Sequence, residues 1–274
     1  MNRLNIEERA RIIGCLVEGN SMRATARLCG VSFKAVNRLL LDVGMACDLY
    51  QNEVLRNLPC KRIQCDEVWA FVGMKEKNVP KEKKGEGYGD IWTWTGLDSD
   101  SKLMVSWLVG RRSTEYAKRF IDDLAGRLAG KVQLTTDAHR PYLNVVEGAF
   151  AANIDYAILH KIYRTPKEGE HRYSPGVCCG TTRGVVCGNP DEKHISTSHV
   201  ERQNLTMRMG MRRMTRLTNA FSKKVDHMKA AVALHFMYYN FGRIHKTLRV
   251  TPAMEAGISQ GLAITFGVWK RLLS

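Results

Sequence analysis

The order of apolar segments in the middle of the chain constrains its fold most strongly. Three runs rich in aromatic and β-branched residues are separated by turn-rich sequence: RIQCDEVWAFV (62–72), DIWTWTGLD (90–98) and KLMVSWLVG (102–110). The next segment, 113–130, predicts a helix with one apolar stripe: Tyr116, Phe120, Leu124 and Leu128. A short strand ending at Asp137 follows it. Three strands, a crossover helix and a fourth strand predict an α/β fold, with a mixed sheet and helices on its faces.

The first forty-odd residues predict three helices. The segment 5–19 has a helical apolar face, and Ser21 and Ser32 are expected N-caps of two short helices separated by Gly30 and Val31. The third helix carries three polar side chains on one face: Lys34, Asn37 and Arg38. This pattern fits a helix-turn-helix that reads DNA with those side chains. A small three-helix bundle with a solvated polar face is the alternative, and the local pattern leaves it open.

The charge of the chain points to a polyanionic partner. Lys and Arg number 42 against 27 Asp and Glu, which gives a formal net charge of +15. Nucleic acid is the first candidate for such a partner, and an anionic membrane is the second. No apolar run is long enough to span a bilayer and the first ten residues lack a signal-peptide core, so we expect a cytoplasmic, nucleoid-associated protein. In that compartment the eight cysteines are expected to be free thiols.

Three carboxylates stand where a purely structural design would avoid them. Asp66 lies within the first strand, Asp137 ends the fourth, and Glu201 lies in the first turn of a basic helix expected over 199–216. If the first and fourth strands are neighbours, the three carboxylates can meet, and clustered carboxylates need a cation. Oxygen ligands favour Mg²⁺ or Mn²⁺, and two such ions per site support phosphodiester displacement. Taken singly, each acid also has an ordinary structural explanation, as an ion-pair partner, a turn former or a favourable charge at a helix start.

Further residues around Glu201 are candidates for DNA contact. Glu201, Leu205, Arg208 and Arg212 share one stripe of the predicted helix, so the arginines, with Arg213, are expected to face DNA phosphates. His199 is close enough in sequence to be an accessory residue, although a capping or solvent-facing histidine is the simpler interpretation. A zinc site is a weak alternative for Cys178, Cys179, Cys187 and His194, because their spacing matches no standard ligand pattern.

Four blocks in order resemble the DDE transposases of bacterial insertion sequences, specifically the InsAB type. The blocks are CDEVWAFVG, TTDAHRPY, HVERQNLTMRMGMRRMTRLTNAFSK and YYNFGRIHKTLRVTPA, which together cover roughly residues 60–255. The resemblance implies an RNase H-like fold with catalytic acids at Asp66, Asp137 and Glu201. It also implies DNA strand cleavage and strand transfer at the ends of a mobile element, and a homo-oligomer on DNA. In the last block the family pattern matches Tyr239, Asn240, Arg243, His245, Thr251 and Pro252.

The resemblance suggests a division of the chain into four parts. Residues 1–45 would be the helix-turn-helix domain, 46–60 a linker with some helix, 61–255 the catalytic domain and 256–274 a C-terminal tail. Residues 160–198 are expected to be an inserted, turn-rich loop that the core fold does not need. Its basic residues are candidates for contact with a second subunit or its DNA: Lys161, Arg164, Lys167, Arg172 and Arg183. Two other functions stay open, a DNA-binding regulator that kept the fold without catalysis and a stand-alone RNase H-like nuclease.

Overall fold

A six-stranded mixed sheet forms the centre of the computed structural model, which describes residues 4–151, 153–164, 177–215 and 218–261. The strands are β1 (Arg62–Val72), β2 (Gly89–Asp98), β3 (Met104–Gly110), β4 (Val132–Asp137), β5 (Ile154–Arg164) and β6 (Val177–Cys187). The helices are α1 (Ile6–Val17), α2 (Met22–Leu28), α3 (Phe33–Val54), α4 (Thr114–Ala125), α5 (Arg140–Phe150), α6 (Ser198–Gly210), α7 (Val225–Phe241) and α8 (Pro252–Glu255). The prediction of an α/β mixed sheet flanked by helices is confirmed.

The pairing of the strands places β1 and β4 side by side. The sheet order is β3-β2-β1-β4-β5-β6, with β1 parallel to β4 and β4 parallel to β5. The β1–β2, β2–β3 and β5–β6 pairs are antiparallel. This order and these directions are consistent with an RNase H-like sheet. The adjacency of β1 and β4 is the condition under which Asp66 and Asp137 can meet.

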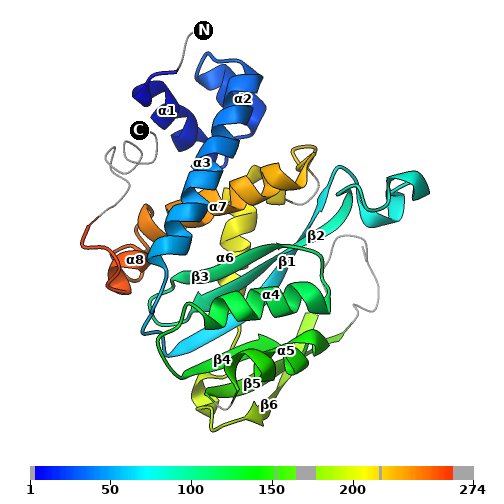
Figure 1. Ribbon diagram of the computed structural model, residues 1–274, viewed down its shortest axis with the longest axis vertical. Helices are drawn as coiled ribbons and strands as arrows, with labels where there is room; N and C mark the ends of the chain where they lie inside the picture. Colours follow the sequence, from blue (N-terminus) through cyan, green and yellow to red (C-terminus); the bar gives the residue numbers. More distant parts are fainter. Residues whose placement is uncertain (1–3, 152, 165–176, 216–217, 262–274) are drawn as a thin grey trace.

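Helices cover both faces of the sheet (Figure 1). α4 and α5 pack together on one face, where Phe120 and Leu124 of α4 come so close to Gly96 of β2 that a Cβ there would lie 3.3 Å from each. α6 and α7 lie on the other face, α6 against β1 and β2 and α7 against β3. The strands β2 and β3 are therefore buried on both sides, which explains their nearly continuous apolar runs, whereas β6 is mostly exposed.

The three N-terminal helices form as expected at their starts, but the third is longer than the sequence suggested. Ser21 and Ser32 cap α2 and α3 through their side-chain oxygens, and Gly30 adopts a positive φ of 65° between them. α3 then continues through most of the stretch expected to be a connector, and its second half packs along α7. At this crossing a Cβ on Gly44 would lie 2.5 Å from the Cα of Ala230. One hydrophobic core accordingly runs from α1 to the sheet.

The segment expected to be an inserted loop is largely part of the sheet. β5 extends to Arg164, and β6 pairs with it from Tyr156–Cys187 to Arg164–Val177. The expectation of a turn-rich loop is therefore wrong for residues 160–164 and 177–187, which form strands, whereas 188–197 contain neither a strand nor an α-helix. β6 escaped prediction because it contains glycines, which indicate turns in a sequence but here accommodate the facing strand: a Cβ on Gly184 would lie 3.1 Å from Ile158. Lys167 and Arg172 lie outside the described residues.

The basic helix is shorter than predicted. α6 ends at Gly210, and Met211 is extended, with φ −117° and ψ 106°. Arg212 therefore lies in a separate 3₁₀ turn (Arg212–Met214) and does not continue the stripe of Glu201. Four apolar side chains in and after this helix are buried: Val200, Met207, Met211 and Met214.

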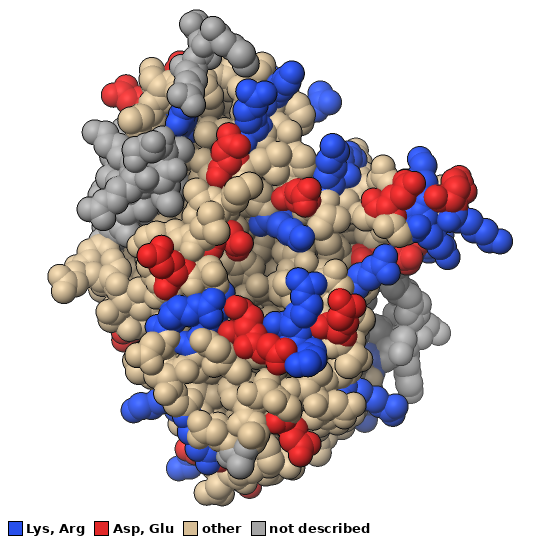
Figure 2. Space-filling model, in the orientation of Figure 1, with Lys and Arg blue, Asp and Glu red and all other residues tan. Residues whose placement is uncertain are grey.

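The charged hairpin loop between β1 and β2 extends away from the body of the protein and holds two short 3₁₀ turns, Glu76–Asn78 and Lys81–Lys83. Lysines and glutamates alternate there, and Figure 2 shows this end as a mixed group of both charges.

In the described part of the chain, no helix has the length and apolar character needed to cross a membrane.

Candidate active site

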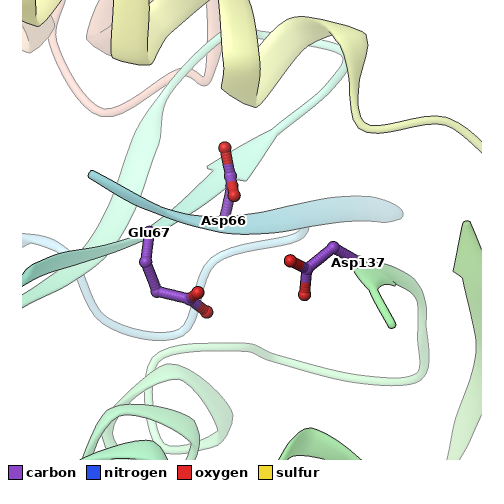
Figure 3. A group of neighbouring side chains, drawn as sticks. All are labelled: Asp66, Glu67 and Asp137. Carbon is purple, nitrogen blue, oxygen red and sulfur yellow. The ribbon is translucent and has the colours of Figure 1, made fainter. Parts of the chain in front are cut away.

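Strand β1 presents two adjacent acids to opposite faces of the sheet. Asp66 leaves β1 on the side of α6, whereas Glu67 leaves it on the side of α4 and α5 (Figure 3). This follows from the alternation of side chains along a strand. The Asp66 carboxylate accepts a hydrogen bond from the Asn204 amide of α6, 2.8 Å away, and the hydroxyl of Thr95 on β2 donates to both the Asp66 carbonyl and the Asn204 amide oxygen. These bonds fix the Asp66 side chain.

Asp137, at the end of β4, forms a close group with the two acids of β1. One oxygen from each of Asp66, Glu67 and Asp137 lies within 4.8 Å of the others. The segment after β4 also holds the Asp137 side chain, because Asp137 Oδ1 accepts a hydrogen bond from the backbone N–H of His139 at 3.0 Å. Figure 3 shows the Asp137 carboxylate beside the strand that carries Asp66 and Glu67. The parallel β1–β4 pairing is the direct cause of this grouping.

Glu201 lines the same pocket from a third element. Gln64 on β1 is buried and its Oε1 accepts from the backbone N–H groups of His199 and Val200, which fastens the start of α6 to the sheet. Glu201, in that first turn, is then held by Lys161 of β5 and by the hydroxyl of Thr197. The pocket has a volume of 450 Å³, and its lining includes Asp66, Asp137, Lys161, Glu201 and Arg112.

Burial and mutual repulsion shift the two β1 acids toward protonation. Burial, together with the charges of Asp137 and Glu201, raises the pKa of Asp66 to about 6, although the hydrogen bond from Asn204 acts in the opposite direction. Burial also raises the pKa of Glu67 to about 7, together with the neighbouring charge of Asp137. Arg112 offsets part of this effect, with its Nε 3.1 Å and its Nη2 3.0 Å from Glu67 Oε2. Its Nη2 also lies 3.8 Å from Asp137 Oδ2.

The donor set fits a hard divalent cation. Asp66, Asp137 and Glu201 supply carboxylate oxygens around one pocket, and the described lining contains no thiolate. The raised pKa values of Asp66 and Glu67 show that burial and mutual repulsion disfavour their charged forms, and a bound cation would relieve this effect. The residues present therefore fit Mg²⁺ or Mn²⁺.

Several residues that line this pocket or contact its acids were not predicted as part of the site from the sequence. Glu67 was hidden because a glutamate next to an aspartate in a strand points to the opposite face. Arg112 and Lys161 reach the pocket from segments far away along the chain. Asn204 could have been found, because it follows Glu201 by three positions and so shares its helix face.

The predicted DNA-contacting residues lie in different settings. Lys34 and Arg38 are exposed on α3 and Asn37 is half-buried. Arg212 is exposed, whereas the guanidinium of Arg208 donates to the carbonyls of Met214 and Trp69. Arg208 thus has backbone partners at the end of α6, which the sequence stripe did not suggest.

His199 does not line the acid pocket. Residues two apart on a helix do not face each other, so His199 and Glu201 diverge. The His199 ring lies 3.3 Å from the Lys102 amine, and burial, then Lys102, lowers its pKa. The sequence-based expectation of an accessory role beside Glu201 is therefore not supported by its position.

Residues of the last sequence block, YYNFGRIHKTLRVTPA, make contacts that stabilise the fold. The Asn240 side chain pairs with both backbone groups of Met104 on β3, and the Tyr239 hydroxyl donates to the Lys102 carbonyl. Thr251 caps α8, which begins at Pro252. These contacts hold α7 and α8 against the sheet.

Cys178, Cys179 and Cys187 are exposed free thiols on β6. Among the described residues, the cluster that could hold a metal ion consists of Asp66, Glu67 and Asp137.

Comparisons with known proteins found similarity to solved structures but no match to a family model or a curated protein. No protein-family model matches the sequence, and no curated protein matches it. Two transposase complexes are distantly similar in structure. A piggyBac transposase synaptic complex with hairpin DNA has 13% sequence identity and a TM-score of 0.40, covering 100% of this chain and 74% of the other. The Mos1 strand transfer complex has 12% identity and a TM-score of 0.23, covering 56% of this chain and 59% of the other. Both TM-scores are below 0.5, so we base the proposed function on the site itself.

Proposed function

We propose that this protein is a DNA transposase that uses Asp66, Asp137 and Glu201 as its catalytic acids. The observation that supports the proposal is that these three carboxylates, from β1, β4 and α6, line one pocket of 450 Å³, in which Asp66 and Asp137 belong to a close group of acids with Glu67. The net charge of +15 would attract a polyanionic substrate, and the proposed helix-turn-helix of α2 and α3 would select it. The division into a reader over 1–45 and a catalytic domain over 61–255 is part of this proposal.

The residues of the pocket have separate roles in the proposed chemistry. Asp66 and Asp137 are oxygen donors held at a fixed spacing by the β1–β4 pair, and Asn204 orients Asp66. Glu201 completes the donor set when it leaves Lys161. Two bound Mg²⁺ ions would act as Lewis acids toward the attacking and leaving oxygens of a phosphodiester.

The reaction has two displacements at phosphorus. In the first, the oxygen of water forms a bond to phosphorus while the bond to the 3′-oxygen breaks, leaving a 3′-hydroxyl on the element end and a 5′-phosphate. In the second, that 3′-hydroxyl oxygen attacks a phosphodiester of the target, and the target's own 3′-oxygen leaves with a proton. The two ends of an element need two such sites, so we propose at least a dimer on DNA.

The test uses the DNA that flanks the gene. Inverted repeats bracketing the reading frame would supply the substrate: labelled duplexes that end in those repeats, incubated with the full chain, Mg²⁺ and a supercoiled target plasmid. We expect cleavage at the repeat ends and joining of labelled strands to the plasmid. Asp66→Ala should abolish both reactions and leave DNA binding equal or tighter, because a repelling charge is removed. The matched control is Asp122→Asn on α4, an exposed acid paired with Lys118 outside the pocket.

The outcome separates the alternatives. Selective binding without cleavage by the unaltered protein would favour a regulator, although clustered, partly protonated acids are costly for a protein that does not use them. Cleavage without end selectivity or joining would favour a nuclease.

A further inference from the structure

A second, larger concavity lies apart from the acid pocket. It has a volume of 690 Å³ and shares no described lining residue with the pocket of Asp66. One wall comes from α2 and the start of α3, and the other from the end of α6, the connection to α7 and the start of α7. We call it the interhelical cleft. It therefore lies between the proposed DNA reader and the helices that cover the sheet.

The interhelical cleft is lined by positive charge. Its basic residues come from both walls: Arg23, Arg212, Arg213, Lys223 and Lys224. No Asp or Glu is among the residues described as lining it. Five cations without a carboxylate around one concavity focus a positive potential into it, and this favours an anionic ligand.

Arg213 shows that this charge is not compensated within the protein. Its Nη1 donates to the Ser222 hydroxyl at 2.8 Å and to the His227 carbonyl at 2.9 Å, and its Nη2 lies 3.6 Å from the Met22 sulfur. All three partners are neutral. Burial lowers the pKa of Arg213 to about 10, and no carboxylate pairs with it among the described residues. Without a carboxylate partner, the charge of this guanidinium adds to the positive potential in the cleft, which favours a phosphate there.

Aromatic rings accompany the cations on both walls. The Arg23 guanidinium lies 5.7 Å from the ring centroid of Phe33, at the start of α3. The Lys223 amine lies 3.2 Å from the ring centroid of Phe221, in the connection between α6 and α7. Phe33 is 49% exposed, so much of its ring is accessible to a ligand in the cleft. Proteins that bind single-stranded nucleic acid combine cations for the backbone with aromatic rings on which bases stack.

We propose that the interhelical cleft binds a short unpaired segment of DNA, with a base on Phe33 and phosphates on the surrounding cations. Bases inside a duplex have both faces covered by their neighbours, so an unpaired base is the form that can stack on an aromatic side chain. Phe33 and Asn37 belong to the helix that is expected to contact duplex DNA, and the unpaired strand would enter the cleft from there. The inference rests on the proposed function for the identity of its polyanion.

The test measures binding of single strands without catalysis. Fluorescence anisotropy of a labelled 12-nucleotide thymidine oligomer, in EDTA, would be compared with a duplex of equal length. We expect Phe33→Ala and Lys223→Gln each to weaken single-strand binding by about 10-fold, because the first loses the stacked base and the second loses a phosphate contact, and to change duplex binding by less than about 2-fold. The matched controls are Leu49→Ala, exposed on the same helix, and Lys229→Gln on α7 outside the cleft.

A second measurement locates the strand. An oligomer that carries 5-iodouracil would be crosslinked by light, and the attached peptides identified by mass spectrometry. Crosslinks to Phe33 or Phe221 support the inference. Equal losses in the controls, or crosslinks confined to the acid pocket, overturn it. The binding assay contains EDTA, so its result does not depend on cleavage. If the protein cleaves and joins DNA but binds single strands elsewhere, only this inference is refuted. If the cleft binds single strands but the protein cleaves no DNA, only the proposed function is refuted.

Discussion

Glu67 has a cost in the folded protein that depends on pH. Its side chain is 2% exposed and its pKa is raised from 4.5 to about 7, mainly by burial. Because the folded state holds the proton more tightly than the unfolded state, stability is lost as the pH rises from about 4.5 through about 7. Glu67→Gln, which cannot ionise, should therefore raise the free energy of unfolding at pH 8 by up to about 3 kcal/mol without metal. The gain should shrink toward zero at pH 4.5.

Urea unfolding of both proteins across this pH range, in EDTA, would measure the effect. A gain that is equal at both ends of the range would show that Glu67 ionisation is not its source. Glu147→Gln on α5 is the control, since it changes a glutamate in an exposed position.

Lys161 competes with a cation for Glu201. It lines the acid pocket and pairs with the Glu201 carboxylate, which a divalent ion would also need. Lys161→Ala should therefore tighten Mn²⁺ binding by about 2- to 5-fold, the range expected for loss of a partly exposed ion pair. Titration calorimetry gives the affinity directly. Lys161→Arg, which preserves the charge, should bind like the unaltered protein, and weaker binding by the Ala variant would contradict the competition.

At the scale of single residues, sequence reasoning found the acids that interrupt a pattern. Asp66 stands out in an apolar strand and Asp137 at the end of another. Glu67, Arg112 and Lys161 did not stand out, because their importance comes from contacts between distant segments. Periodicity cannot supply such contacts.

Among the elements, the crossing of α3 and α7 is built around a missing side chain. A Cβ on Gly44 would lie 2.5 Å from Ala230, closer than real contacts allow. Gly44→Ala should therefore lower the free energy of unfolding by about 1–3 kcal/mol, because the helices must move apart. Gly14→Ala in α1 is a matched control: a Cβ at that position would have no neighbour within 4 Å, and the change should stabilise the helix by about 0.5–1 kcal/mol. Chemical denaturation measures both, and equal effects would refute the packing explanation.

The elements that the sequence predicted well are those with strong local signals. The capped starts of α2 and α3 and the apolar runs of β1 to β3 are examples. β6 was missed because its glycines are explained only by the strand opposite. The end of α6 at Gly210 was also missed, because the arginines after it remain compatible with a helix.

At the scale of the whole molecule, selectivity and affinity for DNA should depend on different regions. Removing residues 1–45 would cut through α3, whose second half is core, so point variants are the better test. Lys34→Gln combined with Arg38→Gln should reduce binding to the element ends by at least about 10-fold more than binding to unrelated duplexes. Competition binding with the two DNAs measures this ratio. Equal losses would show that α3 contributes charge but no recognition.

The unbroken course of α3 gives the protein a fixed measuring length. Its 22 residues span about 33 Å, close to one turn of B-form DNA. The helix begins at the polar face that would contact an element end and is locked to α7 at Gly44, without a flexible joint between. On the proposed function, the number of base pairs between the recognised sequence and the scissile phosphate would then be set by the protein and constant from end to end. An insertion of about five base pairs at that interval would turn the phosphate to the opposite side of the double helix, out of reach of the acids.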